Sequence, residues 1–138
     1  MSRVSDGDSF RCADGRWVRL IGIDSPESQQ RPFGAEARAA LLKLLPPGAP
    51  VRLELDVRPV DQYGRQLAYA WAGPVLVNES MVRGGWAVLY TLPPNVKYAE
   101  RLQQAQKEAR TQGAGLWRER GFGCLPSDFR RGRCGPRQ

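Results

Sequence analysis

Carboxylates and arginines gather in three short segments in the first half of the chain. These are Asp6-Gly7-Asp8, the run from Arg19 to Asp24-Ser25-Pro26-Glu27, and Asp61-Gln62-Tyr63-Gly64-Arg65. Hydrolysis of a phosphodiester needs an activated water, a cation that offsets charge on the phosphoryl oxygens, and donors that hold those oxygens in the transition state. The residue types therefore suit metal-assisted attack on a phosphodiester.

The acidic residues divide into candidate metal ligands and a candidate base. A hard cation such as Ca²⁺ or Mg²⁺ takes oxygen ligands, and Asp8, Asp24 and the backbone carbonyl of Ser25 are of the right type. The chain contains no histidine, which is the commonest general base. Glu27 is therefore the leading candidate to position or deprotonate the water.

Two arginines are candidates to hold phosphate oxygens. Arg19 and Arg65 each carry a planar fork of donors that lysine lacks, and both stay protonated at any working pH. Arg19 lies within an apolar run, so its charge must find a partner or a water-filled cleft. Strand alternation places Arg19 and Asp24 on opposite faces, and we expect a bend at Ser25-Pro26 to bring them together.

Each motif also has a purely structural interpretation. Asp6-Gly7-Asp8 could be a tight turn between strands with solvated aspartates. Pro26 could simply end a strand in a turn, because proline favours an extended backbone at the residue before it. The Tyr63-Gly64-Arg65 segment could be an ordinary hairpin tip.

Taken in this order, the three motifs resemble the staphylococcal nuclease-like family, also called thermonucleases. The resemblance runs from about Val4 to Trp117. It implies a β-rich α+β fold, a five-stranded oligonucleotide/oligosaccharide-binding (OB) barrel with about three helices. It also implies roles for the residues quoted above: Asp8, Asp24 and the Ser25 carbonyl as Ca²⁺ ligands, Glu27 at the attacking water, and Arg19 and Arg65 on the scissile phosphate.

Other segments match the family less closely. Tyr90 falls where the family places an aromatic residue in the nucleotide pocket, and Tyr63 is a second candidate for substrate binding. Only residues 1–5 precede the first motif, so we expect a shortened first strand. The link at 28–33 lacks the lysine-rich loop of the best-known members.

Hydrophobic patterning predicts one domain at 1–117 and a basic, cysteine-containing tail at 118–138. Strict alternation predicts a strand over 51–57 with Val51, Leu53, Leu55 and Val57 facing the core. The pattern further predicts strands at 10–12, 17–23 and 66–71, helices at 34–45 and 98–110, and a short helix at 79–83 capped by Asn78.

The net charge of +7 fits a polyanionic partner. Residues 111–138 hold six basic and two acidic residues, so they supply four of the seven excess charges. The tail is either an electrostatic handle for nucleic acid or a solvated segment that aids solubility. The arginines of this candidate handle are Arg118, Arg120, Arg130, Arg131, Arg133 and Arg137.

The cysteines bear on the compartment. Cys124 and Cys134 bracket a short tail loop and could form a disulfide in an oxidising compartment, whereas Cys12 lies on a predicted strand and is expected to be buried. The sequence has no recognisable leader or membrane span. We expect a secreted or periplasmic protein whose leader is absent from this chain.

These observations favour a calcium-dependent endonuclease, a monomer that cleaves DNA and RNA with little sequence preference. The substrate would preferably be single-stranded, and the family resemblance implies 3′-phosphate products. The alternative is an OB-fold module that binds single-stranded nucleic acid without cutting it. A third interpretation, a structural calcium site, accounts for the acids but leaves the arginines unexplained.

Overall fold

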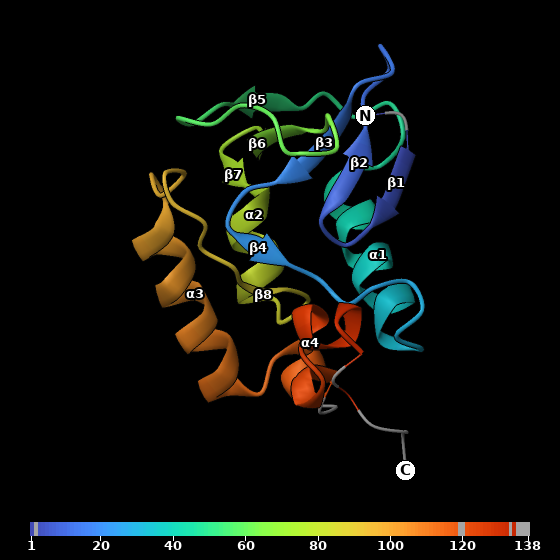
Figure 1. The fold of residues 1–138 in the computed structure, drawn as a ribbon, viewed down its shortest axis with the longest axis vertical. Coiled ribbons are helices and arrows are strands. Elements are labelled where there is room, and N and C mark those ends of the chain that lie inside the picture. Colours follow the sequence, from blue (N-terminus) through green and yellow to red (C-terminus); the bar gives the residue numbers. More distant parts are fainter. Residues whose placement is uncertain (2, 119–120, 133, 135–138) are drawn as a thin grey trace.

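The computed structural model describes residues 1, 3–118, 121–132 and 134 (Figure 1). Its strands are β1 (Arg3–Asp6), β2 (Ser9–Arg11), β3 (Trp17–Leu20), β4 (Ile23–Asp24), β5 (Arg52–Glu54), β6 (Gln66–Ala72), β7 (Val75–Leu76) and β8 (Val88–Leu89). Its α-helices are α1 (Phe33–Leu44), α2 (Val77–Arg83), α3 (Ala99–Gln112) and α4 (Pro126–Arg130). Short 3₁₀ turns occupy Gly115–Trp117 and Gly121–Gly123.

The main sheet has the strand order β1-β2-β3-β6-β5, and β7 pairs with β6. All neighbours are antiparallel except β3 and β6, which are parallel. The short strands β4 and β8 form a separate antiparallel pair. In Figure 1 the sheet lies at one end of the molecule, α2 lies centrally, α3 and α1 lie on opposite sides of it, and α4 lies between their lower ends.

The architecture confirms a β-rich α+β fold of the OB type, although the sheet is open. Strands β1 and β5 lie at its two edges, and no ladder joins them among the described residues. The predicted hairpins are present, because β2 pairs with β3 and β5 pairs with β6. The described fold is therefore a curled sheet whose edges do not meet in a closed barrel.

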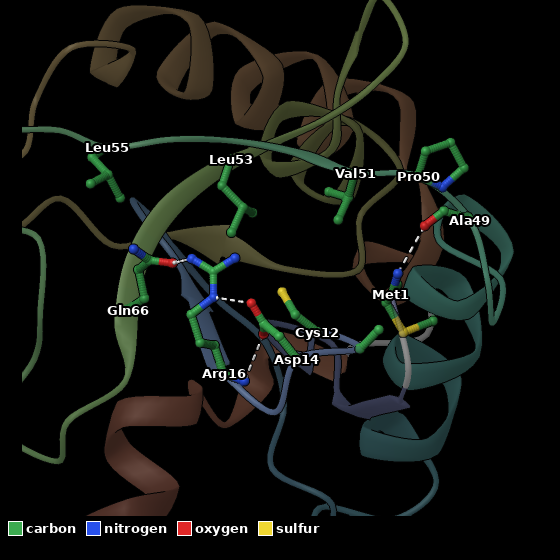
Figure 2. Close-up of a pocket in the computed structure, with 11 residues that line it drawn as sticks. Met1, Cys12, Asp14, Arg16, Ala49, Pro50, Val51, Leu53, Leu55 and Gln66 are labelled. Carbon is green, nitrogen blue, oxygen red and sulfur yellow. Dashed lines mark hydrogen bonds and ion pairs between the residues drawn. The ribbon is translucent and has the colours of Figure 1, made fainter.

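The open edge explains why only the first part of the predicted strand at 51–57 packs toward the core. Val51 and Leu53 are half-buried, but Leu55 is 46% exposed and Val57 is 71% exposed. Strand β5 ends at Glu54, so the alternation of apolar residues continues beyond the paired backbone. Figure 2 shows side chains from this segment facing an open cavity of about 580 Å³, with Cys12 on its opposite wall.

The helices cover the sheet with the faces that the sequence predicts. Helix α3 buries Leu102, Ala105 and Ala109, a stripe with helical spacing, and α1 buries Ala37 and Leu41. Of these side chains, Leu41, Leu102 and Ala105 join the apolar residues of β1, β2 and β3 in the main core. The core thus fixes the strands whose ends carry the three motifs.

Asn78 does not cap α2, contrary to the sequence-based prediction. The helix begins two residues earlier than predicted, at Val77, and Asn78 is fully buried inside it. Its Oδ1 accepts a hydrogen bond from the Ala70 amide at 2.9 Å, and its Nδ2 donates to the Ile21 carbonyl at 2.9 Å. A buried amide needs such partners, and here it ties α2 to β6 and to the turn after β3.

Glu54 anchors the open side of the sheet to the start of α3. Its Oε1 accepts hydrogen bonds from Trp71 Nε1 at 2.9 Å and from the Tyr98 hydroxyl at 2.8 Å, and its Oε2 pairs with the Lys97 ammonium. The hydrogen bond from Lys97, reinforced by those from Trp71 and Tyr98, lowers the pKa of Glu54 to about 2. The carboxylate form is therefore the form that stabilises the fold.

We predict that Glu54→Gln lowers the free energy of unfolding at pH 7 by about 1 kcal/mol, because hydrogen bonds to a charged acceptor are lost. A depressed pKa contributes stability above the unfolded-state value, near 4.5, and this is lost as pH falls through about 2. The difference between parent and variant should thus shrink between these two pH values. Urea denaturation at pH 7 and pH 2.5 measures it, with the exposed Glu100→Gln as control. A pH-independent difference would contradict the assignment.

Candidate active site

The first motif forms the turn between β1 and β2, and its glycine is required by close packing. A Cβ on Gly7 would lie 2.7 Å from Ser25 Cβ and 2.8 Å from Ala37 Cβ, so the turn packs directly on the loop after β4 and on α1. Asp8 is only 6% exposed. Its carbonyl accepts the Leu20 amide at 2.9 Å. The solvated-turn interpretation is therefore wrong for Asp8, which lies beside β3.

The bend that brings Arg19 to Asp24 occurs earlier than the sequence suggested. Strand β3 ends at Leu20, Gly22 has a φ of +82°, and β4 begins at Ile23. This left-handed residue resets the alternation, and Arg19 Nη2 lies 3.3 Å from Asp24 Oδ1. The prediction that a bend at Ser25-Pro26 brings Arg19 to Asp24 is therefore wrong. The turn at Gly22 brings these two side chains together.

The guanidinium of Arg19 is held on several sides. Nη1 donates to the carbonyls of Leu20 and Ile23, each at 2.9 Å. Nη2 contacts Asp24 and also lies 3.5 Å from Asp8 Oδ2. Its side chain is 13% exposed. The buried charge that the sequence singled out thus has two carboxylate partners, as burial of a charge requires.

Asp6 was not among the predicted site residues, although it lies in the first motif. Burial, together with the neighbouring charge of Asp8, raises the pKa of Asp6 to about 8. Burial also acts on Asp8, but Arg19 and hydrogen bonds from Asp6, Ser25 and Ser9 outweigh it and lower the pKa of Asp8 to about 2. The two carboxyls titrate as a coupled pair, in which the pKa of Asp6 is raised and that of Asp8 is lowered.

Asp24 and Glu27 meet a third arginine, which comes from the tail. Arg130 Nη2 lies 2.6 Å from Asp24 Oδ2, and its Nη1 donates to Asp24 Oδ1 at 3.0 Å and to Glu27 Oε1 at 2.8 Å. Burial raises the pKa of Asp24, although Arg130 and Arg19 oppose the shift. Hydrogen bonds from Arg130 to Asp24 and Glu27 raise the pKa of the arginine.

This contact changes the interpretation of the predicted handle. Arg130 was expected on a solvated or nucleic-acid-binding tail, and it lies in the candidate site. Arg131 is exposed, whereas Arg120, Arg133 and Arg137 lie outside the described residues. The contact joins residues 106 positions apart, so no local pattern in the sequence could have revealed it.

The third motif is organised by Asp61. Its Oδ1 accepts the amides of Tyr63 at 2.8 Å and Arg65 at 3.0 Å, and its Oδ2 accepts Arg65 Nε at 2.8 Å. The guanidinium of Arg65 lies over the ring of Tyr63, which is 74% exposed. Asp61 thus fixes both the turn and the direction of Arg65.

One cavity of about 480 Å³ brings the motifs together. Among its lining residues are Asp8, Arg19, Asp24, Glu27, Tyr63, Arg65 and Tyr90, together with Asp6, Arg58 and Arg130, which were not predicted as site residues. The amide of Tyr90 donates to the Gly22 carbonyl at 2.8 Å, which places Tyr90 next to the turn. Every predicted site residue except Ser25 lines this cavity.

Ser25 lies immediately behind the cavity wall. Its amide donates to Asp8 Oδ2 at 2.9 Å, and its buried hydroxyl has no hydrogen-bond partner among the residues that the structure describes. Within the described ranges, no three His, Cys, Asp or Glu side chains form a ready-made metal cluster. Calcium also takes backbone carbonyls and water, so Asp8, Asp24 and the Ser25 carbonyl form a donor set of the right chemistry.

Comparison with known proteins identifies the family of this chain. Residues 17–119 match the family described as "Staphylococcal nuclease homologue". The thermonuclease of Staphylococcus hyicus is 39% identical over 123 residues, which cover 83% of this chain and 72% of the relative. The thermonuclease of Staphylococcus intermedius is 38% identical, covering 85% and 74%, and endonuclease YncB of Bacillus subtilis (strain 168) is 30% identical, covering 88% and 62%. The resemblance stated from the motifs is therefore confirmed, and the chain belongs to the staphylococcal nuclease family.

Proposed function

We propose that this phosphodiester-cleaving hydrolase is a calcium-dependent endonuclease that cuts DNA and RNA with low sequence specificity and leaves 3′-phosphate ends. One observation carries the proposal. Buried carboxylates, a more accessible glutamate and two arginines from separate motifs converge on a single cavity. That is the set of groups that phosphodiester hydrolysis needs.

The proposed roles follow from burial and position. Asp8 and Asp24, with the Ser25 carbonyl, would hold Ca²⁺, which when bound offsets negative charge on the phosphoryl oxygens. Glu27 is more accessible, with 31% of its side chain exposed, so a water can approach its carboxylate. In this scheme Glu27 takes a proton from the water, and the water oxygen forms a bond to phosphorus. The bond from phosphorus to the 5′ oxygen breaks, the 5′ oxygen takes a proton from solvent, and the phosphate stays on the 3′ side.

The two arginines would divide the work of holding the phosphate. Arg65 is 35% exposed, and Asp61 holds its guanidinium through Nε, so part of its donor fork remains available to phosphate oxygens. Arg19 is more deeply held, and its main contribution would be to fix the acids and to add positive charge behind the phosphate. Tyr63 and Tyr90 offer rings to unpaired bases, which supports a preference for single strands.

The rival function is a binding module that does not cut. A module of that kind needs basic and aromatic residues but gains nothing from burying Asp8 and Asp24 beside Glu27. Burial of charged acids is costly, and metal chemistry gives it a purpose. The site chemistry therefore supports the enzyme over the module and over a purely structural calcium site.

The setting of the protein is also a proposal. The structure contains a disulfide between Cys124 and Cys134, and Cys12 is free and buried. Disulfides persist in oxidising compartments, which supports a secreted or periplasmic location, and we propose that the protein acts there as a monomer. In the described part of the chain, no helix is both long and apolar enough to span a bilayer.

The first test follows hydrolysis of heat-denatured DNA and of RNA at mildly alkaline pH, with Ca²⁺ and then with chelator. We expect calcium-dependent release of acid-soluble nucleotides, and we expect Arg65→Ala to lower the rate by about 100-fold or more because a donor to the developing charge is lost. Arg52→Ala removes an exposed arginine that stacks on Trp71 outside the cavity and serves as the matched control. Binding of single strands without release of nucleotides would establish the rival module.

A second test separates the base from the metal ligands. Glu27→Gln should slow turnover by about 10²- to 10⁴-fold while nucleotide affinity changes little, because only the proton acceptor is lost. Asp24→Asn should instead raise the calcium concentration needed for half-maximal activity. Single-turnover experiments measure the rate of the chemical step, and calcium titrations measure the calcium concentration for half-maximal activity. Parallel losses of both quantities in each variant would argue against separate roles.

A further inference from the structure

The tail places a positive charge on the same acids that are proposed to act in catalysis. Arg130 uses both terminal nitrogens on Asp24, at 3.0 and 2.6 Å, and also reaches Glu27 at 2.8 Å. Asp24 is 1% exposed, whereas the Arg130 side chain is 38% exposed. Arg130 therefore enters from the solvent side and covers the accessible edge of a buried carboxylate.

The segment that delivers Arg130 is braced on both sides of α4. The disulfide between Cys124 and Cys134 closes a loop around the helix, with the two Cα atoms 5.8 Å apart. Gln30, itself 6% exposed, donates through Nε2 to the Cys124 carbonyl at 3.2 Å and accepts the Glu27 amide through Oε1 at 2.9 Å. One side chain thus joins the closed loop to the backbone of the proposed base.

A second contact fixes the chain that leads into this loop. The rings of Trp117 and Phe122 lie 4.7 Å apart, and Phe122 is buried with Val88 and Leu116. Strand β8, which contains Val88, pairs with β4, so the tail packs on the elements that carry Asp24. These contacts hold the tail arginine at a high effective concentration over the site.

Arg130 and a divalent cation would compete for the same carboxylates, because both carry positive charge. Asp8, Asp24 and Glu27 form an acidic group that Arg19 balances only in part. Arg130 adds charge of the sign that a cation would add, and it occupies both oxygens of Asp24. A cation bound to Asp24 would face a guanidinium at contact distance, so repulsion favours one occupant at a time.

We infer that Arg130 is an internal competitor for the metal ion, a latch on Asp24 and Glu27 that the Cys124–Cys134 disulfide holds closed. This inference rests on the proposed function, in which Asp24 binds the cation. Metal binding then requires the latch to open, and the apparent affinity falls by the fraction of molecules in which it is open. Reduction of the disulfide releases the Cys134 side of the loop, lowers the effective concentration of the arginine and strengthens metal binding.

The test measures Ca²⁺ binding by isothermal titration calorimetry, with no nucleic acid present. We expect Arg130→Ala and Arg130→Gln to bind Ca²⁺ about tenfold more tightly than the parent, within the range usual for coupled sites. Arg131→Ala is the matched control, because it removes the same charge from the next, exposed position. Its affinity should stay within about twofold of the parent. Circular dichroism and thermal melting check that each variant is folded.

The second part of the test removes the disulfide by substitution. A Cys124→Ser, Cys134→Ser double variant should bind Ca²⁺ more tightly than the parent, and the same pair of changes in an Arg130→Ala background should add nothing. Parent and Arg130 variants of equal affinity would overturn the latch, because the contact would then be a salt bridge that only fixes the tail. Weaker binding in the Arg130 variants would overturn it as well.

The outcomes also separate the latch from the proposed function. In one outcome the parent binds calcium, Asp24→Asn abolishes that binding, and the Arg130 variants show no gain in affinity. That result removes the latch and leaves the nuclease proposal intact. Absence of calcium binding in every variant removes both, because no cation competes with the arginine. Binding that appears only in the Arg130 variants supports both.

Discussion

The pairing of Arg19 with two buried carboxylates is the interaction on which the candidate site depends. Burying Asp8 and Asp24 costs solvation free energy, and the Arg19 guanidinium, which contacts both carboxylates, offsets part of that cost. The same guanidinium donates to two backbone carbonyls of the turn after β3, so it also fixes the path of the chain. Charge compensation and backbone geometry therefore depend on the same side chain.

The sheet decides where these groups meet. Hairpin pairing of β2 with β3 brings the first motif beside Arg19, and parallel pairing of β3 with β6 places the third motif, which directly precedes β6, alongside β3. Loops positioned by a rigid sheet can present side chains from distant segments to one cavity. The open edge between β1 and β5 lies away from this arrangement, beside a different cavity.

Sequence reasoning succeeded where residue type and local pattern carry the information. Carboxylates and arginines in three motifs, and the stripe through Leu102, could be recognised without a structure. It failed where the backbone departs from regular periodicity: the left-handed turn at Gly22 resets alternation, and pairing of β5 ends before Leu55. The position of Arg130 depends on a contact across most of the chain, which local pattern cannot encode.

The tail arginines consequently differ in what they contribute to the field around the site. Arg130 and Arg131 count equally toward the net charge, but the charge of Arg130 is neutralised by Asp24 and Glu27, whereas Arg131 is exposed. A cation that displaces Arg130 would return its charge to the mouth of the cavity, where a polyanionic strand must enter. Metal binding and attraction of the substrate would then be linked through one side chain, because the same guanidinium that opposes the cation is attracted to phosphate once released.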